Sequence, residues 1–372
     1  MEENLREESE PPQKRFRCTQ KQWNDWNWQI SNRIRTIKQF KEIFNIDPST
    51  LKLEEVIKKY PFAITPYYAS LIKKLDYTDP IFAQSVPNVF ELEDSEYLVD
   101  DPLNESEEMA VPFLVHRYKD RALLLSTTTC STLCRFCTRK RMVGKKECHI
   151  SSKRLEKIKS YLLQHEEIKD VIVSGGDPFT QENSFIEEIL ETLRPIPHID
   201  IIRFGTRVPV VLPQRITPKL VAMLKKYKPL WINTHFNHSS EITPESIEAC
   251  RKIIDAGIPM GNQTVLLKGV NDNSETMKEL CRNLIKIPVK PYYLYSADLV
   301  RGSEHFRAPV ERGISIMADL RGRLSGIAIP TFVIDAPGGK GKIPILPNYY
   351  IGKKDNLHYL KNFEGEEVIY PD

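Results

Sequence analysis

The 372-residue chain lacks any long uncharged hydrophobic run. No window approaches the ~18 apolar residues of a membrane-spanning helix, and residues 1–14 are acidic and polar where a secretory signal would be basic and then apolar. We therefore expect no membrane partner and a cytoplasmic location. Hydrophobic residues make up 41% of the chain, enough for a buried core, so disorder of the whole chain is excluded.

The sequence also lacks an excess of charge of one sign. Lys and Arg number 53 against 50 Asp and Glu, which gives a formal net charge of +3. A nucleic-acid-binding protein usually concentrates positive charge on one face, so no nucleic-acid partner is expected. The seven cysteines are an odd number in a chain without a secretory signal, which argues against a disulfide framework.

Hydrophobic periodicity divides the chain into four parts. Residues 1–20 lack periodicity and predict a disordered tail, and residues 21–112 predict an N-terminal helical region with a long connection. From residue 113 short apolar runs alternate with amphipathic segments. The predicted strands are 122–126, 171–174, 199–204, 230–234, 260–267 and 289–295, followed after residue 300 by a helix at 314–324 and a strand at 329–334. The alternation predicts a parallel sheet covered by helices, with 113–300 as its core and 301–372 as a C-terminal segment.

No G-x-G-x-x-G follows the first predicted strand of this sheet. A doubly wound dinucleotide-binding sheet is therefore disfavoured, and we predict an α/β fold built as a partial (β/α) barrel. In either architecture ligands bind at the carboxyl ends of the strands. Residues that directly follow the strands are the candidate site.

Three cysteines, Cys130, Cys134 and Cys137, directly follow the strand predicted at 122–126. Three thiolates can hold three irons of a [4Fe-4S] cluster and leave the fourth iron open for another ligand. Zinc is the alternative, because Cys148 and His149 lie downstream and could complete a tetrahedral site. A zinc-stapled nucleic-acid-binding protein is the corresponding hypothesis from a different functional class.

The Cys-x-x-x-Cys-x-x-Cys spacing after a first barrel strand resembles the radical S-adenosylmethionine enzymes. That resemblance implies that the open iron binds S-adenosylmethionine. Ser174, Gly175, Gly176 and Asp177 follow the next predicted strand and resemble the glycine-rich element that binds the methionine amino group in this superfamily. Two adjacent glycines allow close approach of the backbone to a ligand.

A glycine-rich turn near the other end contains two lysines, Lys340 and Lys342. It does not satisfy the P-loop pattern, because Ile343 stands where Ser or Thr is required. A lysine presented on such a turn can form a Schiff base with pyridoxal phosphate.

Over most of its length the sequence resembles the lysine 2,3-aminomutase family, which combines both cofactors. The resemblance runs through 23–29, 63–68, 116–121, 130–139, 174–177, 209–217, 233–238, 261–263, 291–295 and 335–350. It implies that Lys342 is catalytic and carries pyridoxal phosphate, that Arg117, Tyr118, Arg121 and Tyr295 hold that cofactor, and that His235 and Gln263 contact S-adenosylmethionine. Relatives usually have glycine at the position of Lys340.

The resemblance also implies a substrate, L-lysine, converted to L-β-lysine by radical migration of the amino group. Arg139 matches the arginine that binds the substrate α-carboxylate, and Asp298 and Asp335 match the aspartates that bind the ε-ammonium. Two carboxylates would repel the side chain of glutamate, so a cationic substrate is favoured. The alternatives are another cationic amino acid, or β-lysine made for modification of a translation factor.

The family further implies an electron donor such as flavodoxin or ferredoxin, and a homo-oligomer. Longer members carry a cysteine-rich zinc-binding extension after the region matched here. This chain ends at Asp372 and has Asn273 where those members have a partnering cysteine, so zinc is not expected.

Overall fold

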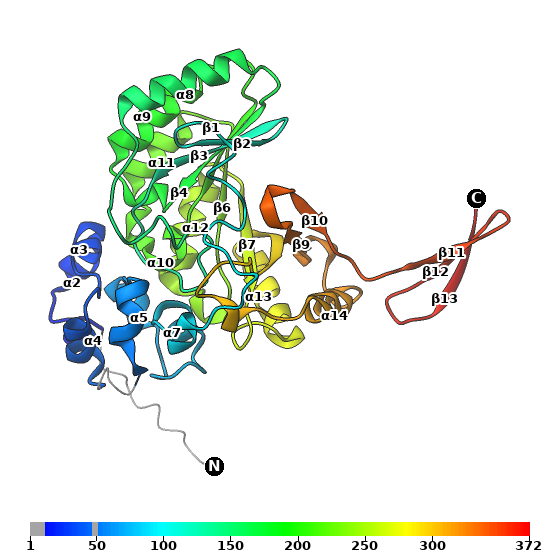
Figure 1. Cartoon of the computed structure of the whole chain (residues 1–372), viewed down its shortest axis with the longest axis horizontal. Helices are drawn as coiled ribbons and strands as arrows, with labels where there is room; N and C mark the ends of the chain where they lie inside the picture. The colour runs from blue at the N-terminus through cyan, green and yellow to red at the C-terminus, as the bar shows by residue number, and fades with distance from the viewer. Residues whose placement is uncertain (1–11, 47–50) are drawn as a thin grey trace, which may run out of the picture.

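A ten-stranded sheet forms the centre of the computed structural model, which describes residues 12–46 and 51–372 (Figure 1). Its strands lie side by side in chain order: β1 (Met109–Val111), β2 (Leu114–Tyr118), β3 (Arg121–Thr127), β4 (Asp170–Gly175), β5 (Ile201–Gly205), β6 (Leu230–Thr234), β7 (Met260–Leu266), β8 (Lys290–Ser296), β9 (Thr331–Asp335) and β10 (Lys342–Pro344). Neighbours from β3 to β9 pair in parallel, and the pairs β1–β2, β2–β3 and β9–β10 are antiparallel. Among the described residues β1 and β10 remain the two ends of the sheet, so the barrel is partial, as predicted.

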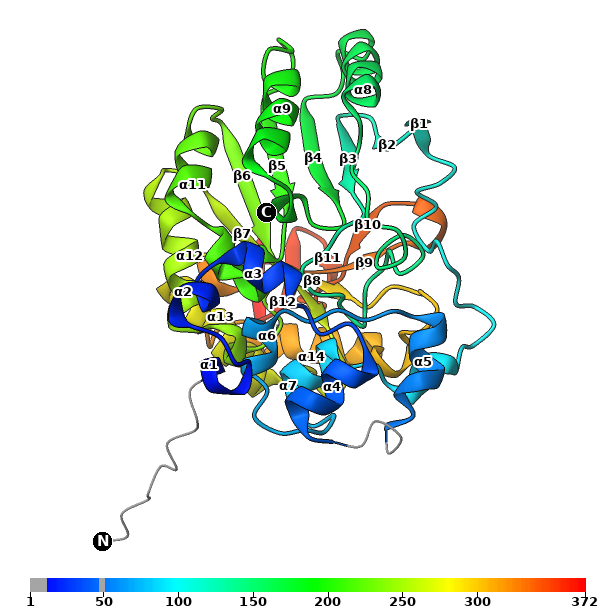
Figure 2. The same ribbon diagram turned by 90° about the vertical axis from the view of Figure 1, so that its left-hand side faces the viewer.

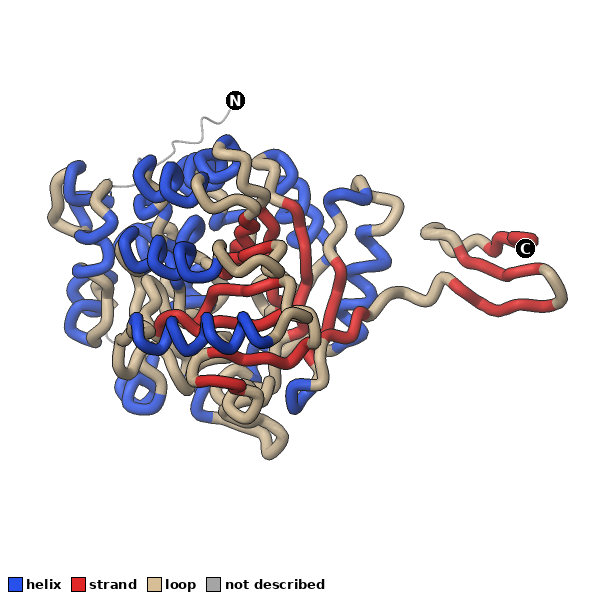
Figure 3. Tube along the Cα trace, turned by 90° about the horizontal axis from the view of Figure 1, so that it is seen from above, coloured by secondary structure: helices blue, strands red, loops and turns tan. Residues whose placement is uncertain are grey.

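Helices connect the parallel strands and lie on the outside of the sheet (Figures 2 and 3). They are α8 (Ser152–Gln164), α9 (Asn183–Leu193), α10 (Val208–Val211), α11 (Pro218–Lys225), α12 (Pro244–Asp255), α13 (Ser274–Lys286) and α14 (Val310–Leu320). Thr217 and Thr243 cap α11 and α12, each with proline at the first helical position. The capping hydroxyl satisfies a backbone N–H that the helix itself leaves unpaired.

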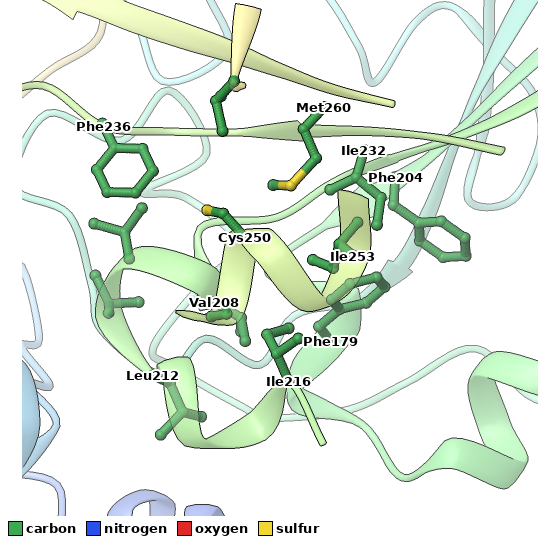
Figure 4. Packing of buried hydrophobic residues seen from close by; sticks show 14 of the residues in the cluster. Phe179, Phe204, Val208, Leu212, Ile216, Ile232, Phe236, Cys250, Ile253 and Met260 are labelled. Carbon is green, nitrogen blue, oxygen red and sulfur yellow. The ribbon is translucent and has the colours of Figure 1, made fainter. Parts of the chain in front are cut away.

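The core between helix and sheet is continuous and apolar. Figure 4 shows Cys250 and Ile253 of α12 facing Phe204, Ile232 and Met260 of the neighbouring strands. All five are at most 3% exposed. Burial of a large apolar side chain contributes about 1.5–3 kcal/mol, so this layer holds the strand ends in fixed positions.

The N-terminal region is helical, with α1 (Pro12–Arg15), α2 (Gln20–Trp23), α3 (Trp26–Ser31), α4 (Ile37–Phe44), α5 (Leu53–Lys59), α6 (Pro66–Ser70), α7 (Pro80–Ser85) and the short η2 (Val89–Leu92). These helices lie near the carboxyl ends of the strands (Figure 2). Of the predicted tail, residues 1–11 lie outside the described residues, whereas α1 and the start of α2 differ from that prediction. The reason is local: Thr19 and Gln22 form a capping box, and the ring of Phe16 lies 5.7 Å from that of Trp23.

The C-terminal end forms a second, three-stranded antiparallel sheet from β11 (Tyr350–Lys354), β12 (Leu357–Lys361) and β13 (Glu367–Pro371). This sheet, which we call the C-terminal arm, projects away from the body (Figures 1 and 3). Tyr350, Ile351, Ile369 and Tyr370 on it are each at least half exposed. Within the described part of the chain, no helix combines the length and hydrophobicity needed to cross a membrane.

Candidate active site

Two cavities lie against the predicted site residues at the carboxyl ends of the strands. The first, of about 310 Å³, is lined by Cys130, Cys134, Cys137, Arg139, Ser174, Gly175, Gly176, Asp177, His235, Gln263, Tyr295, Asp298, Asp335 and Lys342. The second, of about 260 Å³, is lined by Arg117, Tyr118 and Arg121 and shares Arg139, Ser174, Gln263, Tyr295 and Lys342 with the first. The fold therefore brings together residues that are far apart in the sequence. Arg117 and Lys342, for example, are separated by 225 positions. Cys148 and His149 line neither cavity.

The cysteine loop follows β3 and presents its three thiols to the first cavity. Two of the sulfur atoms accept hydrogen bonds: Cys134 Sγ from Arg207 Nη1 at 2.8 Å, and Cys137 Sγ from the backbone N–H of Arg139 at 3.3 Å. Such donors stabilise thiolates, the form that binds iron. Burial raises the pKa of the Cys137 thiol to about 11 and raises that of Cys130 as well, so a bound cation is what would keep these thiols ionised.

In residues 12–46 and 51–372 no three His, Cys, Asp or Glu side chains are gathered closely enough to hold a single ion. In a [4Fe-4S] cube each cysteine binds a different iron, so such a cluster needs no closer gathering. The donor set fits this cluster.

A buried ion-pair network holds the cysteine loop from behind. Glu91 in η2 is fully buried and pairs with Arg135 at 2.5 Å and Lys140 at 2.8 Å, two residues that flank Cys137. Burial opposes ionisation of Glu91, but the two cations outweigh it and hold the pKa of Glu91 below its usual value. Burial lowers the pKa of Lys140 to about 8. Sequence reasoning missed Glu91, because nothing in the local sequence links it to a loop more than forty positions away.

The glycine-rich element after β4 packs tightly against the cysteine loop. A Cβ at Gly176 would lie 2.4 Å from the carbonyl oxygen of Thr129, and Gly175 has φ +121°. A larger residue at either position would displace backbone, so glycine is required.

Asp177 directs its carboxylate toward the next loop of the sheet. It accepts hydrogen bonds from Thr206 Oγ1 at 2.6 Å and from the backbone N–H of Arg207 at 2.8 Å. Burial raises its pKa to about 6. In this structure Asp177 positions the loop after β5 and leaves less of its carboxylate for direct contact with a cofactor.

The carboxyl end of β6 carries three buried polar atoms that have no hydrogen-bond partner in the described residues: Asn233 Oδ1, Thr234 Oγ1 and His235 Nε2. All three side chains line the first cavity. Burial lowers the pKa of His235 to about 3, so its ring is neutral. Buried polar atoms are nearly always paired, so these fit a polar ligand such as S-adenosylmethionine. Sequence reasoning gave a role only to His235; the polar end of an otherwise apolar strand was the missed signal.

Lys342 begins β10 and lies where the two cavities meet. Its Nζ lies 2.8 Å from Asp335 Oδ1, and its backbone N–H donates to the Tyr118 hydroxyl at 3.0 Å. The guanidinium of Arg121 stacks 4.0 Å from the centre of the Tyr118 ring. Lys340, in contrast, is exposed and lines neither cavity. An amine beside two arginines fits an aldehyde cofactor that carries a phosphate.

An acidic segment before β1 orients two of the predicted arginines. Glu105 is 1% exposed and binds Arg139 at 2.7 Å, and Glu108 binds Arg117 at 2.5 Å. Arg139 Nη1 remains directed toward the carbonyl of Gly175 at 3.5 Å. These acids lie in the long connection predicted from sequence, where no periodicity marked them.

Asp298 follows β8 and lines the first cavity, where it is partly exposed. It accepts a hydrogen bond from Thr138 Oγ1 at 2.5 Å. Burial, together with the nearby charge of Asp335, raises the pKa of Asp298 to about 6. An acid whose pKa is raised in this way gains from a cationic ligand.

Comparison with known proteins identifies the family of the chain. Residues 124–281 match the radical SAM superfamily model, and residues 317–372 match the model described as lysine-2,3-aminomutase. The L-lysine 2,3-aminomutase of Clostridium subterminale is 49% identical over 94% of this chain and 84% of that protein. That of Acetoanaerobium sticklandii is 48% identical over 95% and 86%. The glutamate 2,3-aminomutase of Clostridioides difficile is 42% identical over 95% and 84%.

Proposed function

The chain belongs to the lysine 2,3-aminomutase family of radical S-adenosylmethionine enzymes, and on this premise we propose that it interconverts L-lysine and L-β-lysine. The family predicted from the sequence is thereby confirmed, and with it the prediction of an isomerase. The observation that carries the proposed substrate is the placement of Asp298, Asp335 and Arg139 around one cavity that also contains the three cysteines.

The family implies a [4Fe-4S] cluster and S-adenosylmethionine. Cys130, Cys134 and Cys137 would hold the cluster. The residues that would hold S-adenosylmethionine are Ser174, Gly175, Gly176, His235 and Gln263, to which the structure adds Asn233. When bound, these groups supply a carbon radical that can abstract hydrogen, which is formed by reductive cleavage of S-adenosylmethionine. The contribution of the chain is to fix both groups on rigid strand ends and to keep the cavity enclosed.

Pyridoxal phosphate is the second proposed cofactor, with Lys342 as its covalent attachment. Arg117 and Arg121 would pair with the phosphate, and Tyr118 and Tyr295, which line the same cavity, would hold the ring. The chemistry it supplies is delocalisation of an unpaired electron during migration of nitrogen. Glu108 holds Arg117 in position for this task.

The substrate would lie between two sets of charges. Arg139 donates from Nε and Nη2 to Glu105, and its Nη1, which makes only a long contact with the Gly175 carbonyl, would take the α-carboxylate. Asp298 and Asp335 would take the ε-ammonium at the other end. Lysine satisfies both sets, whereas the side-chain carboxylate of glutamate would face two acids, so the lysine reaction is favoured over that of the glutamate relative.

Two proposals concern partners. A one-electron donor such as flavodoxin or ferredoxin would reduce the cluster. The C-terminal arm, with its exposed apolar side chains, supports a homo-oligomer. A cytoplasmic location remains a prediction.

An anaerobic assay tests the activity. Protein reconstituted with iron and sulfide is incubated with dithionite, S-adenosylmethionine, pyridoxal phosphate and L-lysine, with L-glutamate as the competing substrate. We expect β-lysine from lysine and no β-glutamate. The Cys134→Ala variant removes one of three cluster anchors and should lose all turnover; normal turnover in that variant would contradict the radical mechanism.

Borohydride reduction tests the attachment site. It should fix pyridoxal phosphate on Lys342, because only this lysine of the turn lines both cavities. Peptide mapping identifies the modified residue, and Lys342→Ala serves as the control. Label on Lys340 would mean that the attachment lysine has been assigned to the wrong position.

A further inference from the structure

Arg207 makes a contact that the reaction described above does not use. It lies in the loop between β5 and α10, is 8% exposed, and donates from Nη1 to the sulfur of Cys134 at 2.8 Å. We infer that Arg207 raises the reduction potential of the cluster bound through Cys134, and that Glu241 moderates this effect. The inference rests on the proposed function, because it concerns the cluster assigned there.

The guanidinium is fixed by contacts on its other sides. Its Nε donates to the carbonyl of His235 at 3.1 Å, and its Nη2 donates to Gln84 Oε1 and Glu241 Oε1, both at 2.7 Å. The backbone N–H of Arg207 is held by Asp177. Because the side chain is anchored in this way, Nη1 is aimed at the sulfur by the fold.

Glu241 is itself a fixed charge. It is fully buried, accepts from the hydroxyl of Tyr68 at 2.7 Å, and accepts from the backbone N–H groups of Asn237 and His238. It contacts Nη2, whereas the sulfur contacts Nη1. The sulfur is therefore closer to the positive group than to the carboxylate that neutralises it.

The electrostatic consequence has a definite sign. Reduction adds one electron to the cluster, taken from a one-electron donor, and forms no new bond. The added negative charge is stabilised by a cation and an N–H donor at a ligand sulfur, and hydrogen bonds to sulfur are among the features that set cluster potentials. A nearby carboxylate lowers the reduction potential, because it repels the added negative charge. Both electrostatic effects are large where water is excluded.

The test is a redox titration followed by electron paramagnetic resonance, on full-length protein reconstituted with the cluster. Arg207→Gln removes the cation, and we expect a lower potential than in the native protein. Glu241→Gln removes the opposing charge, and we expect a higher potential. Arg215→Gln is the matched control, because Arg215 is also a buried arginine but contacts the Gln181 carbonyl and the Trp26 ring. Its potential should equal that of the native protein.

The outcomes separate the inference from other roles. A purely structural role would lower iron content in both variants without shifting the potential of the loaded fraction in opposite directions. Equal potentials in all four proteins, or shifts of the same sign in the two variants, would overturn the inference. A potential that stays unchanged in Arg207→Gln while affinity for S-adenosylmethionine falls would assign the arginine to that ligand and would also overturn it.

If Arg207→Gln does not fold, Arg207→Lys keeps the charge but changes the donor geometry, and its potential should be lower than that of the native protein. Glu241→Gln tests the opposite sign independently. Failure of the native protein to bind four irons would contradict the proposed function itself, which distinguishes that failure from failure of this inference.

Discussion

At the scale of single residues, the proposed choice of substrate rests on the two carboxylates at the carboxyl ends of β8 and β9. Asp298 lines the first cavity together with Asp335, Arg139 and Lys342, and Asp335 is 7% exposed at its side chain. Each would give the ε-ammonium a charge-assisted hydrogen bond in a partly dehydrated cavity.

Replacement of either aspartate by Asn should lower kcat/KM for lysine about ten- to a hundredfold, because one such bond is worth about 1.5–3 kcal/mol. Steady-state kinetics measure the loss. Iron content should stay native in both variants, and cofactor absorbance should stay native in Asp298→Asn; Asp335 also contacts Lys342, so its variant is read from kinetics at saturating pyridoxal phosphate. Asp200→Asn, at an exposed position, is the matched control. Native kinetics in both aspartate variants would mean that these acids do not bind the side chain of the substrate.

The raised pKa of Asp298, about 6, predicts a pH dependence. The ε-ammonium stays charged over this range, since its ordinary pKa is about 10.4. Binding of lysine favours the ionised aspartate, which is lost as the pH falls through about 6. The KM for lysine should therefore rise below that pH and be flat above it. In Asp298→Asn the rise should be smaller, and an identical profile in that variant would assign the titration to another group.

The sequence predicted those site residues that a local pattern marks. Cys130, Cys134 and Cys137 have a fixed spacing, and Lys342 stands in a glycine-rich turn. Glu105 and Glu91 carry no such mark, because each acts through a partner more than thirty positions away. Such pairings depend on how the chain folds back on itself, which periodicity does not encode.

At the scale of elements, the cysteine loop has no regular secondary structure and depends on its contacts with the N-terminal region. The backbone N–H of Leu133 donates to the carbonyl of Ala63, and that of Arg135 donates to Gln84. Glu91 adds the ion pairs on both sides of Cys137. The N-terminal region therefore helps to hold the loop that carries the proposed cluster ligands.

Glu91→Gln should lower both stability and cluster loading. Breaking a buried ion pair by removal of one partner costs about 3–5 kcal/mol, because the remaining charges are left uncompensated. Chemical denaturation and iron analysis measure the two effects. Glu93→Gln, on an exposed neighbour, should behave as the native protein. Native stability and native iron content in Glu91→Gln would show that the loop is held by other contacts.

The parallel strands and the longer helices between them were predictable from short apolar runs and from apolar positions three and four apart. The antiparallel strands β1, β2 and β10 were not, since β1 and β10 have three residues each and only part of β2 is buried. The C-terminal arm was also missed. None of its strand residues is buried, so these strands lack the buried apolar runs by which the strands of the body were recognised.

At the scale of the whole molecule, the arm contrasts with the body. It is a single three-stranded sheet that projects from the body, as Figure 3 shows. Ile369 and Tyr370 are 56% and 63% exposed. Small sheets need a covering layer for stability, and exposed apolar patches commonly mark interfaces.

The full-length protein should therefore sediment as a homo-oligomer, and Ile369→Glu should shift it to a smaller species by placing a charge in the interface. Analytical ultracentrifugation measures the masses. Lys361→Glu, on an exposed residue of the same sheet, controls for the charge alone. A monomeric native protein would contradict the proposed assembly.

The position of Arg139 bears on how the substrate of such an enzyme can change. Arg139 touches the Cys137 sulfur with its backbone N–H and faces the cavity with its side chain. With Arg139 in its proposed role, a single residue sets the spacing between the cluster and the α-carboxylate of the substrate. The proposed recognition of the side chain lies elsewhere, after β8 and β9. Replacement of the two aspartates can therefore change which amino acid is accepted, while the distance between the cluster and the reacting carbon stays the same.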